Sequence, residues 1–258
     1  MRSLKGLSVA LTILFALVAL VDVGAAVARN NRAGLLDDIA ASTFGLGVTE
    51  QEITDADTAV QGFGGVHLLL AIAIVVVLMI WQFRHAKNAE LLGTTGGLGA
   101  GWAIGGWFIP IGNLVLPAVQ MFQSSKASDV SARRHGGQPK GAGVVIAWAI
   151  AFALGGVLLA SSGALVSSDD EGNIIIDDVQ DIEDAASSDR TAGAGYAVLV
   201  VAAGLGAAMV RTLTNRQTNA YAATGAAAPA AASPPPPPAT PPPLPSPPGT
   251  PTPPPPPL

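Results

Sequence analysis

The chain has 258 residues, of which 50% are hydrophobic and 12% are charged. An ordinary soluble domain carries about 25% charged residues, so this composition argues against a soluble globule. The net charge of -5 argues against a nucleic-acid binder. The chain has no cysteine, which excludes disulfides and cysteine-ligated metal sites. Because the apolar residues are gathered into long runs, the sequence predicts a multi-pass, all-α membrane protein.

The apolar runs predict four transmembrane helices, at about residues 7–28, 64–83, 143–166 and 195–210. The first run is also compatible with a cleaved signal peptide, but it continues to full spanning length, which favours a retained helix. A fifth stretch, residues 98–122, is apolar but is broken by several glycines and by Pro110 and Pro117. Each of these prolines removes a backbone hydrogen bond from a regular helix.

The basic residues indicate whether the broken segment 98–122 crosses the membrane. If it crosses, five Lys and Arg residues are cytoplasmic and eight are outside, whereas if it returns to the same side, ten are cytoplasmic and three are outside. Short cytoplasmic loops are enriched in Lys and Arg. We therefore predict four transmembrane helices plus one proline-broken re-entrant or interfacial segment. In this topology both termini lie on the cytoplasmic side of the cell membrane.

Residues 1–216 form the predicted helical transmembrane domain, and residues 217–258 are predicted to be a disordered cytoplasmic tail. From Pro229 onward, 18 of the 30 residues are proline and none is charged. Such a segment cannot form a packed core and favours an extended polyproline II conformation. Polyproline II segments bind aromatic grooves of partner proteins at little entropic cost. A disordered spacer without a partner is the alternative interpretation.

Two acidic segments, residues 29–63 and 167–192, are expected on the outer side of the membrane. Thr49 and Glu52 have the spacing of a capping box and predict a short helix that begins at Thr49. The second segment resembles a calcium-binding loop only weakly, because Asp178 stands where a bidentate glutamate is required. We interpret both segments as solvated acidic surface and predict no metal site.

Two ionisable residues lie inside predicted spans, where charge is costly and therefore marks functional candidates. Asp22 and His67 both lie toward the outer ends of their helices, so antiparallel packing can bring them together as a proton-sensitive couple. Hydration of both groups at the interface is the alternative. Ser162 would complete a serine-hydrolase triad, but serine in an Ala/Ser/Gly stretch is typically a packing residue. We predict that the protein is not an enzyme and holds no cofactor.

The broken segment contains a specific motif, because residues 101–110 read GWAIGGWFIP. Together with a W-x-x-R-x-x-x-N element just upstream, this motif resembles bacterial membrane proteins of the domain-of-unknown-function family numbered 4328, over about residues 60–215. The resemblance implies an actinobacterial multi-pass membrane protein without an established activity. The residues that carry it are Trp81, Arg84, Asn88, Trp102, Gly106, Trp107, Phe108, Pro110, Asn113 and Pro117.

The motif also has a physical interpretation. Trp102 and Trp107 are expected to anchor at the membrane interface, and the amide of Asn113 is expected to cap a backbone group that the prolines leave free, or a polar substrate. The sequence departs from the family pattern at residues 120–123, which read QMFQ where relatives often have an acidic residue and a tryptophan.

The leading functional hypothesis is a non-enzymatic membrane anchor or scaffold whose proline-rich tail recruits a cytoplasmic protein. Its expected partners are the lipid bilayer and that protein, with no nucleic acid. The alternative is a small transporter or channel subunit that uses the broken segment 98–122 near Asp22 and His67, because discontinuous helices often mark binding sites.

Overall fold

The structure is a computed structural model that describes residues 2–42, 47–93, 97–134, 142–163 and 179–226. Every regular element in these ranges is helical, which confirms the all-α class. The elements are α1 (Lys5–Ala41), α2 (Glu50–Leu91), α3 (Trp102–Gly105), the 3-10 helices η1 (Gly106–Phe108) and η2 (Gly112–Leu114), α4 (Leu116–Arg134), α5 (Gly143–Gly163) and α6 (Val179–Ala226). Four of them, α1, α2, α5 and α6, are long and apolar enough to cross a membrane.

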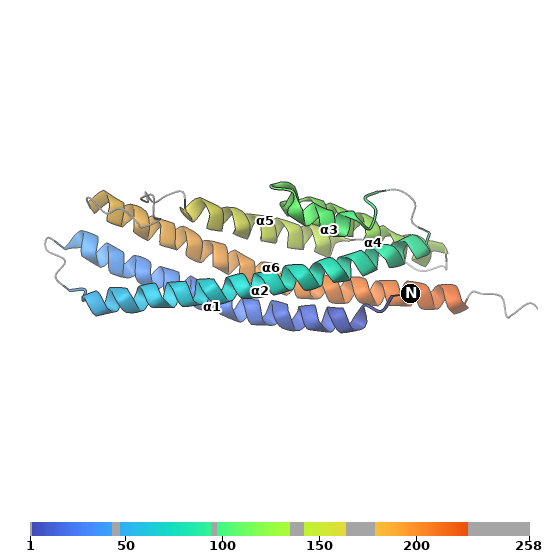
Figure 1. The fold of residues 1–258 in the computed structure, drawn as a ribbon, viewed down its shortest axis with the longest axis horizontal. Helices are drawn as coiled ribbons and strands as arrows, with labels where there is room; N and C mark the ends of the chain where they lie inside the picture. Colours follow the sequence, from blue (N-terminus) through green and yellow to red (C-terminus); the bar gives the residue numbers. More distant parts are fainter. Residues whose placement is uncertain (1, 43–46, 94–96, 135–141, 164–178, 227–258) are drawn as a thin grey trace, which may run out of the picture.

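The four long helices form an elongated bundle in which α1 lies against α2 and α6, and α5 lies against α6 (Figure 1). Chain direction alternates along the bundle: α1 and α5 run away from the end that holds the N-terminus, and α2 and α6 run back. The described parts of the chain therefore begin and end at the same end of the bundle. This up-and-down arrangement places residues that are distant in sequence at the same level of neighbouring helices.

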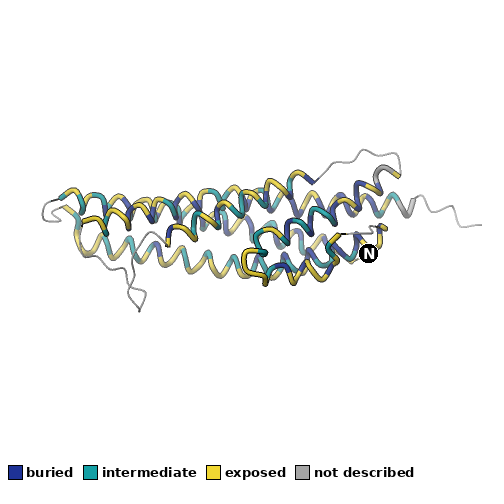
Figure 2. The backbone as a smooth tube through the Cα atoms, turned by 90° about the horizontal axis from the view of Figure 1, so that it is seen from above, coloured by how far each residue is buried: buried dark blue, intermediate teal, exposed yellow. Residues whose placement is uncertain are grey.

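Helices α1, α2 and α6 are longer than the apolar runs that predicted them. Helix α1 has 37 residues and α2 has 42, which correspond to about 55 and 63 Å at 1.5 Å per residue. A hydrocarbon core is about 30 Å thick, so both helices extend well beyond it. Large apolar side chains such as Leu20 and Leu69 are 72% and 69% exposed on the outer surface. Figure 2 shows exposed positions along the outside of the bundle, as expected for a surface that faces lipid.

Glycines allow close approach of the helices at a few positions. A Cβ atom added to Gly206 of α6 would lie 2.7 Å from Cζ of Phe15 on α1. A Cβ atom added to Gly24 of α1 would lie 2.3 Å from Cε1 of Phe63 on α2. Small residues that admit a neighbouring side chain are typical of helix contacts in membranes, where packing replaces the hydrophobic driving force.

The proline-broken segment starts and finishes at the same end of the bundle (Figure 1). Helix α3 and η1 run inward, and the chain turns around Ile111, whose φ of 64° is rare for a β-branched residue. Helix α4 then runs back, with Pro117 in its first turn, where the missing N–H costs little. The structure thus confirms four long helices plus one broken segment that does not cross the bundle from end to end.

The structure differs from two predictions of helix extent. The capping box is present, because the Thr49 hydroxyl accepts the Glu52 N–H at 3.2 Å and the Glu52 carboxylate accepts the Thr49 N–H at 2.8 Å. However, it begins the long helix α2 rather than a separate short helix. Helix α6 continues to Ala226, beyond the predicted tail boundary at residue 217.

Some predictions lie outside the described residues. They include the proline-rich part of the tail, residues 227–258, and the calcium-loop alternative, all of which falls in residues 164–178. The rest of the second acidic segment, residues 179–192, forms the first turns of α6.

Candidate functional site

Asp22 of α1 and His67 of α2 are in direct contact. Nδ1 of His67 donates to Oδ1 of Asp22 across 2.5 Å, and the Asp22 side chain is only 1% exposed. The His67 ring also packs edge-on against Tyr196 of α6, with 5.3 Å between ring centroids. Antiparallel packing of α1 and α2 therefore brings the two ionisable residues together. The Asp22 carboxylate is buried there rather than directly hydrated.

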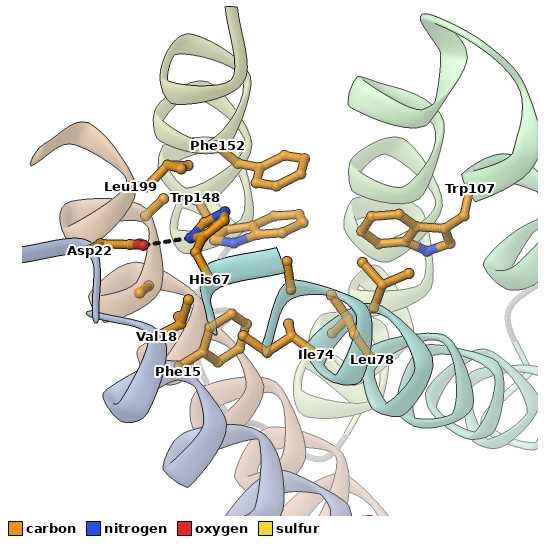
Figure 3. A pocket seen from close by; sticks show the side chains of 14 residues that line it. Phe15, Val18, Asp22, His67, Ile74, Leu78, Trp107, Trp148, Phe152 and Leu199 are labelled. Carbon is orange, nitrogen blue, oxygen red and sulfur yellow. Dashed lines mark hydrogen bonds and ion pairs between the residues drawn. The ribbon is translucent and has the colours of Figure 1, made fainter. Parts of the chain in front are cut away.

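The pair forms the polar wall of an otherwise apolar pocket of about 100 Å³ (Figure 3). The pocket lies between α1, α2, α5 and α6, and Trp107 of the broken segment also lines it. Three of its aromatic rings contact one another: Trp148 stacks on Phe152 at 5.4 Å, and Trp107 meets Phe152 edge-on at 6.4 Å. The arrangement can hold a small, mainly apolar molecule with one polar end.

Ser162 does not join this pair. Its hydroxyl donates to the carbonyl of Leu159 at 2.8 Å, within α5, and its own carbonyl accepts from Ser188 of α6 at 2.8 Å. In the part of the chain that the structure describes, no hydrogen bond connects Ser162 with His67. The contacts are those of a packing serine.

An ion-pair network surrounds the buried Asp189 in the half of the bundle away from the N-terminus. Asp189 of α6, whose side chain is almost fully buried, accepts from Arg29 at 2.6 Å and from Arg32 at 3.1 Å. Arg32 also pairs with Asp57 of α2 at 2.6 Å. The interpretation of the acidic segments as solvated surface is therefore wrong for Asp189, which connects α6 to two arginines of α1.

A directed chain of hydrogen bonds joins the broken segment to α2. The indole N–H of Trp107 donates to Oε1 of Gln82 at 3.3 Å, and Nε2 of Gln82 donates to the Pro117 carbonyl at 3.0 Å. Nε2 of Gln82 also donates to Oε1 of Gln120 on α4 at 2.8 Å. An indole N–H can only donate and a carbonyl can only accept, so both ends fix the orientation of the Gln82 amide. Gln82 thus ties the first turn of α4 to α2.

Within the described residues, two buried atoms next to these hydrogen bonds lack a hydrogen-bond partner: Nε2 of Gln120 and Nε2 of His85. The Ser124 hydroxyl donates to the Met121 carbonyl at 3.1 Å, so it can only accept from Nδ1 of His85, 3.1 Å away. The neutral His85 ring therefore presents an unprotonated Nε2. Between α2 and α4, Nε2 of Gln120 can therefore still donate a hydrogen bond, and Nε2 of His85 can still accept one.

A family model described as a domain of unknown function, DUF4328, matches residues 45–215. The chain belongs to the DUF4328 family. No curated protein and no solved structure matched the chain significantly. The matched region begins just before α2, so α1, which carries Asp22, lies outside it.

Several motif residues of the DUF4328 domain pack inside the bundle. Trp81 is buried and donates its indole N–H to the Thr214 hydroxyl of α6 at 3.0 Å. Asn88 is buried and donates to the Arg2 carbonyl at 2.9 Å and to Oε1 of Gln217 at 3.1 Å. Gly106 is also buried, and a Cβ atom there would lie 3.1 Å from Cβ of Leu116. These residues hold α2, α6 and the broken segment together.

Pro117 is also buried, whereas most of the other motif residues lie nearer the surface. Arg84 donates to the Ser3 carbonyl at 3.4 Å, and Trp102 is exposed, as an interface anchor would be. Trp107 instead turns inward, which corrects its assignment as an interface anchor. The Asn113 backbone N–H donates to the Ile109 carbonyl at 2.8 Å, but its side-chain amide makes no hydrogen bond to any described residue. Exposed positions also include Phe108 and Pro110.

Sequence reasoning missed the buried amides Gln82, Gln120 and Gln217. One signal was present in α2, where Gln82, His85 and Asn88 recur every three residues and so lie near one face of the helix. Polar residues near the end of an apolar run are easily assigned to the headgroup region. Only the packing of α4 and α6 against α2 shows that they are buried.

Proposed function

We propose that this DUF4328 protein is a non-enzymatic integral protein of the cell membrane that anchors its proline-rich C-terminal segment and presents it to a cytoplasmic protein partner. The lipid bilayer is its other partner, and neither a cofactor nor nucleic acid takes part. The observation that carries the proposal is the way in which the last turns of α6, directly before residue 227, are held by the rest of the bundle.

Buried polar contacts hold these turns of α6 against α2 and α4. Arg216 pairs with Asp129 of α4, and both side chains are nearly buried. Nε2 of Gln217 donates to the backbone carbonyl of His85 at 2.9 Å, and Oε1 of Gln217 accepts from Asn88. A segment that starts from a fixed helix keeps a defined position relative to the membrane. This supports a role for the helical domain as a platform for the proline-rich residues.

The cytoplasmic placement of this segment rests on the distribution of charge. The end of the bundle that holds the N-terminus also holds most of the basic residues, and Lys and Arg are enriched in cytoplasmic loops. Both termini then face the cytoplasm, where a groove lined by aromatic side chains can bind an extended proline-rich segment.

Deletion of residues 229–258 tests the recruitment proposal. Proteins captured by the full chain should be lost with the truncated chain, and they should also be lost when a Gly/Ser segment of equal length replaces residues 229–258. The second variant keeps the spacing and removes the polyproline II conformation. Unchanged capture with both variants would contradict recruitment by the proline-rich segment.

A second function, as a small transporter or channel subunit, is supported by one specific observation. Trp107 from the broken segment and the Asp22–His67 pair line the same pocket. Discontinuous helices beside ionisable residues are typical of substrate sites in transporters. Disruption of the gene would then impair uptake of the substrate, and expression of the chain lacking residues 229–258 would restore that uptake. Failure of the truncated chain to restore uptake would favour recruitment alone.

A further inference from the structure

We propose that the pocket beside Asp22 and His67 binds a small organic cation, a primary amine with a short apolar body, through the Asp22 carboxylate. The inference rests on the second function proposed above, for which it names the substrate class. Three properties of the pocket support it: the charge at its polar wall, the aromatic rings of its interior and its size.

The charge comes from a single carboxylate in an apolar surrounding. The bond to His67 engages Oδ1 of Asp22, and among the described residues Oδ2 has no hydrogen-bond partner. An ionised carboxylate has about four lone-pair sites, so it can accept from an ammonium group while it keeps the bond to His67. Apart from Asp22 and His67, the residues that line the pocket are all apolar or aromatic.

Such a surrounding makes the pocket selective for charge. Attraction between opposite charges is several-fold stronger at an effective dielectric constant of about 20 than in bulk water. When the His67 ring is neutral, an anion would meet the carboxylate without a compensating positive side chain in the pocket wall, and a neutral alcohol would gain only an ordinary hydrogen bond. The ammonium group is therefore the head group that the pocket favours most.

The aromatic rings match the rest of the ligand. Trp107, Trp148 and Phe152 line the pocket together, and Figure 3 shows the rings of Trp148 and Phe152 beside His67 and the ring of Trp107 farther from the pair. The faces of tryptophan rings attract cations electrostatically, and their carbon surface accepts an alkyl chain. The ligand can thus place its charge at Asp22 and its apolar body among the rings.

The size of the pocket limits the body of the amine. Its volume is about 100 Å³, whereas an apolar cavity of about 150 Å³ is known to hold benzene. A ligand with a short alkyl chain, such as n-butylamine, fits this space. Longer chains would have to extend out of the pocket.

Three ligands of equal length test the charge preference: n-butylamine, n-butanol and butyrate. Binding to the purified full-length protein in detergent is followed by the fluorescence of Trp107 and Trp148. We expect n-butylamine to bind at least about tenfold more tightly than n-butanol, and butyrate not to bind. Equal binding of the amine and the alcohol would overturn the inference but would leave the pocket, and a transport function for neutral molecules, in place.

Two matched variants locate the charge that is recognised. Asp22→Asn should abolish the preference for the amine over the alcohol, whereas Asp55→Asn, which changes an exposed acid on α2, should keep it. An unchanged preference in Asp22→Asn would place the cation elsewhere and overturn the inference. If Asp22→Asn does not fold, Trp148→Phe serves as the second variant, and a fluorescence response to n-butylamine that is unaffected by both Trp148→Phe and Trp107→Phe would overturn it. Loss of uptake in the gene disruption tests the transport function separately.

Discussion

Nδ1 of His67 on α2 lies 2.5 Å from Oδ1 of Asp22 on α1, and this contact joins two helices within their apolar parts. Removal of one member of a buried ion pair is strongly destabilising, because the charge that remains is still buried away from water but has lost its partner. The pair therefore contributes to the stability of the bundle as well as to the pocket.

The first prediction concerns this pair. His67→Ala should lower the free energy of unfolding by about 3 kcal/mol, because it leaves the Asp22 carboxylate buried without its hydrogen-bond donor. The double variant with Asp22→Asn should lose less than the sum of the single losses. Chemical denaturation in detergent micelles measures both, with Leu69→Ala on the exposed surface of α2 as the control. Additive losses would show that the two side chains do not interact.

The second prediction compares two glutamines of the same chain of hydrogen bonds. Gln82→Leu should cost about 2 to 3 kcal/mol, because it removes partners from the Trp107 indole and from Oε1 of Gln120. Gln120→Leu should cost less, since Gln82 keeps its bond to the Pro117 carbonyl and the Gln120 amide nitrogen has no described partner to lose. Thermal unfolding of the two variants, followed by circular dichroism, ranks them. A larger loss of stability in Gln120→Leu than in Gln82→Leu would contradict the assigned directions of these hydrogen bonds.

The third prediction uses two glycines of α6 that are two residues apart. Gly206→Ala should destabilise the bundle by about 1 to 3 kcal/mol, because the new Cβ would lie 2.7 Å from the Phe15 ring. Gly204→Ala has open space around its new Cβ and should be neutral or stabilising by up to about 1 kcal/mol. Unfolding in detergent measures both. Equal effects of the two substitutions would mean that α1 and α6 do not approach at Phe15.

The fourth prediction concerns pH and the start of α2. The backbone N–H and the hydroxyl of Thr49 hold the pKa of the Glu52 carboxyl below its ordinary value. The stabilisation is therefore complete above the ordinary glutamate pKa of about 4.3 and is lost as the pH falls through the lowered pKa of the folded state. The protection factor for hydrogen exchange at the Glu52 amide, which corrects for the intrinsic pH dependence of exchange, should fall on acidification. Thr49→Ala should increase this exchange already at neutral pH, and an unchanged rate in that variant would argue against the cap.

The sequence alone predicted the features that depend on local chemistry. Hydropathy located the four spans, the prolines and basic residues located the broken segment, and the spacing of Thr49 and Glu52 located the start of α2. Asp22 and His67 were singled out because charge is costly inside a span, and antiparallel packing explains why they meet.

Other features depend on contacts between distant segments. Hydropathy identifies only the part of a helix that lipid surrounds, so the continuation of α6 to Ala226 gave no apolar signal. The inward orientation of Trp107 follows from a partner on α2 and one on α5, which a motif cannot indicate. Burial of Asp189 likewise depends on two arginines of α1. In each case the deciding neighbour lies far away in the sequence.

The broken segment enters the bundle and returns to the end from which it came, and this path brings Trp107 to the Asp22–His67 pocket. The chain has no cysteine, so single cysteines can be labelled from one side of the membrane with an impermeant maleimide. Exposed positions Glu90, before the segment, and Val130, after it, are suitable, with Asp55 as the reference for the opposite side. We expect Glu90→Cys and Val130→Cys to be labelled from the same side and Asp55→Cys from the other. Labelling of Glu90→Cys and Val130→Cys from opposite sides would contradict it.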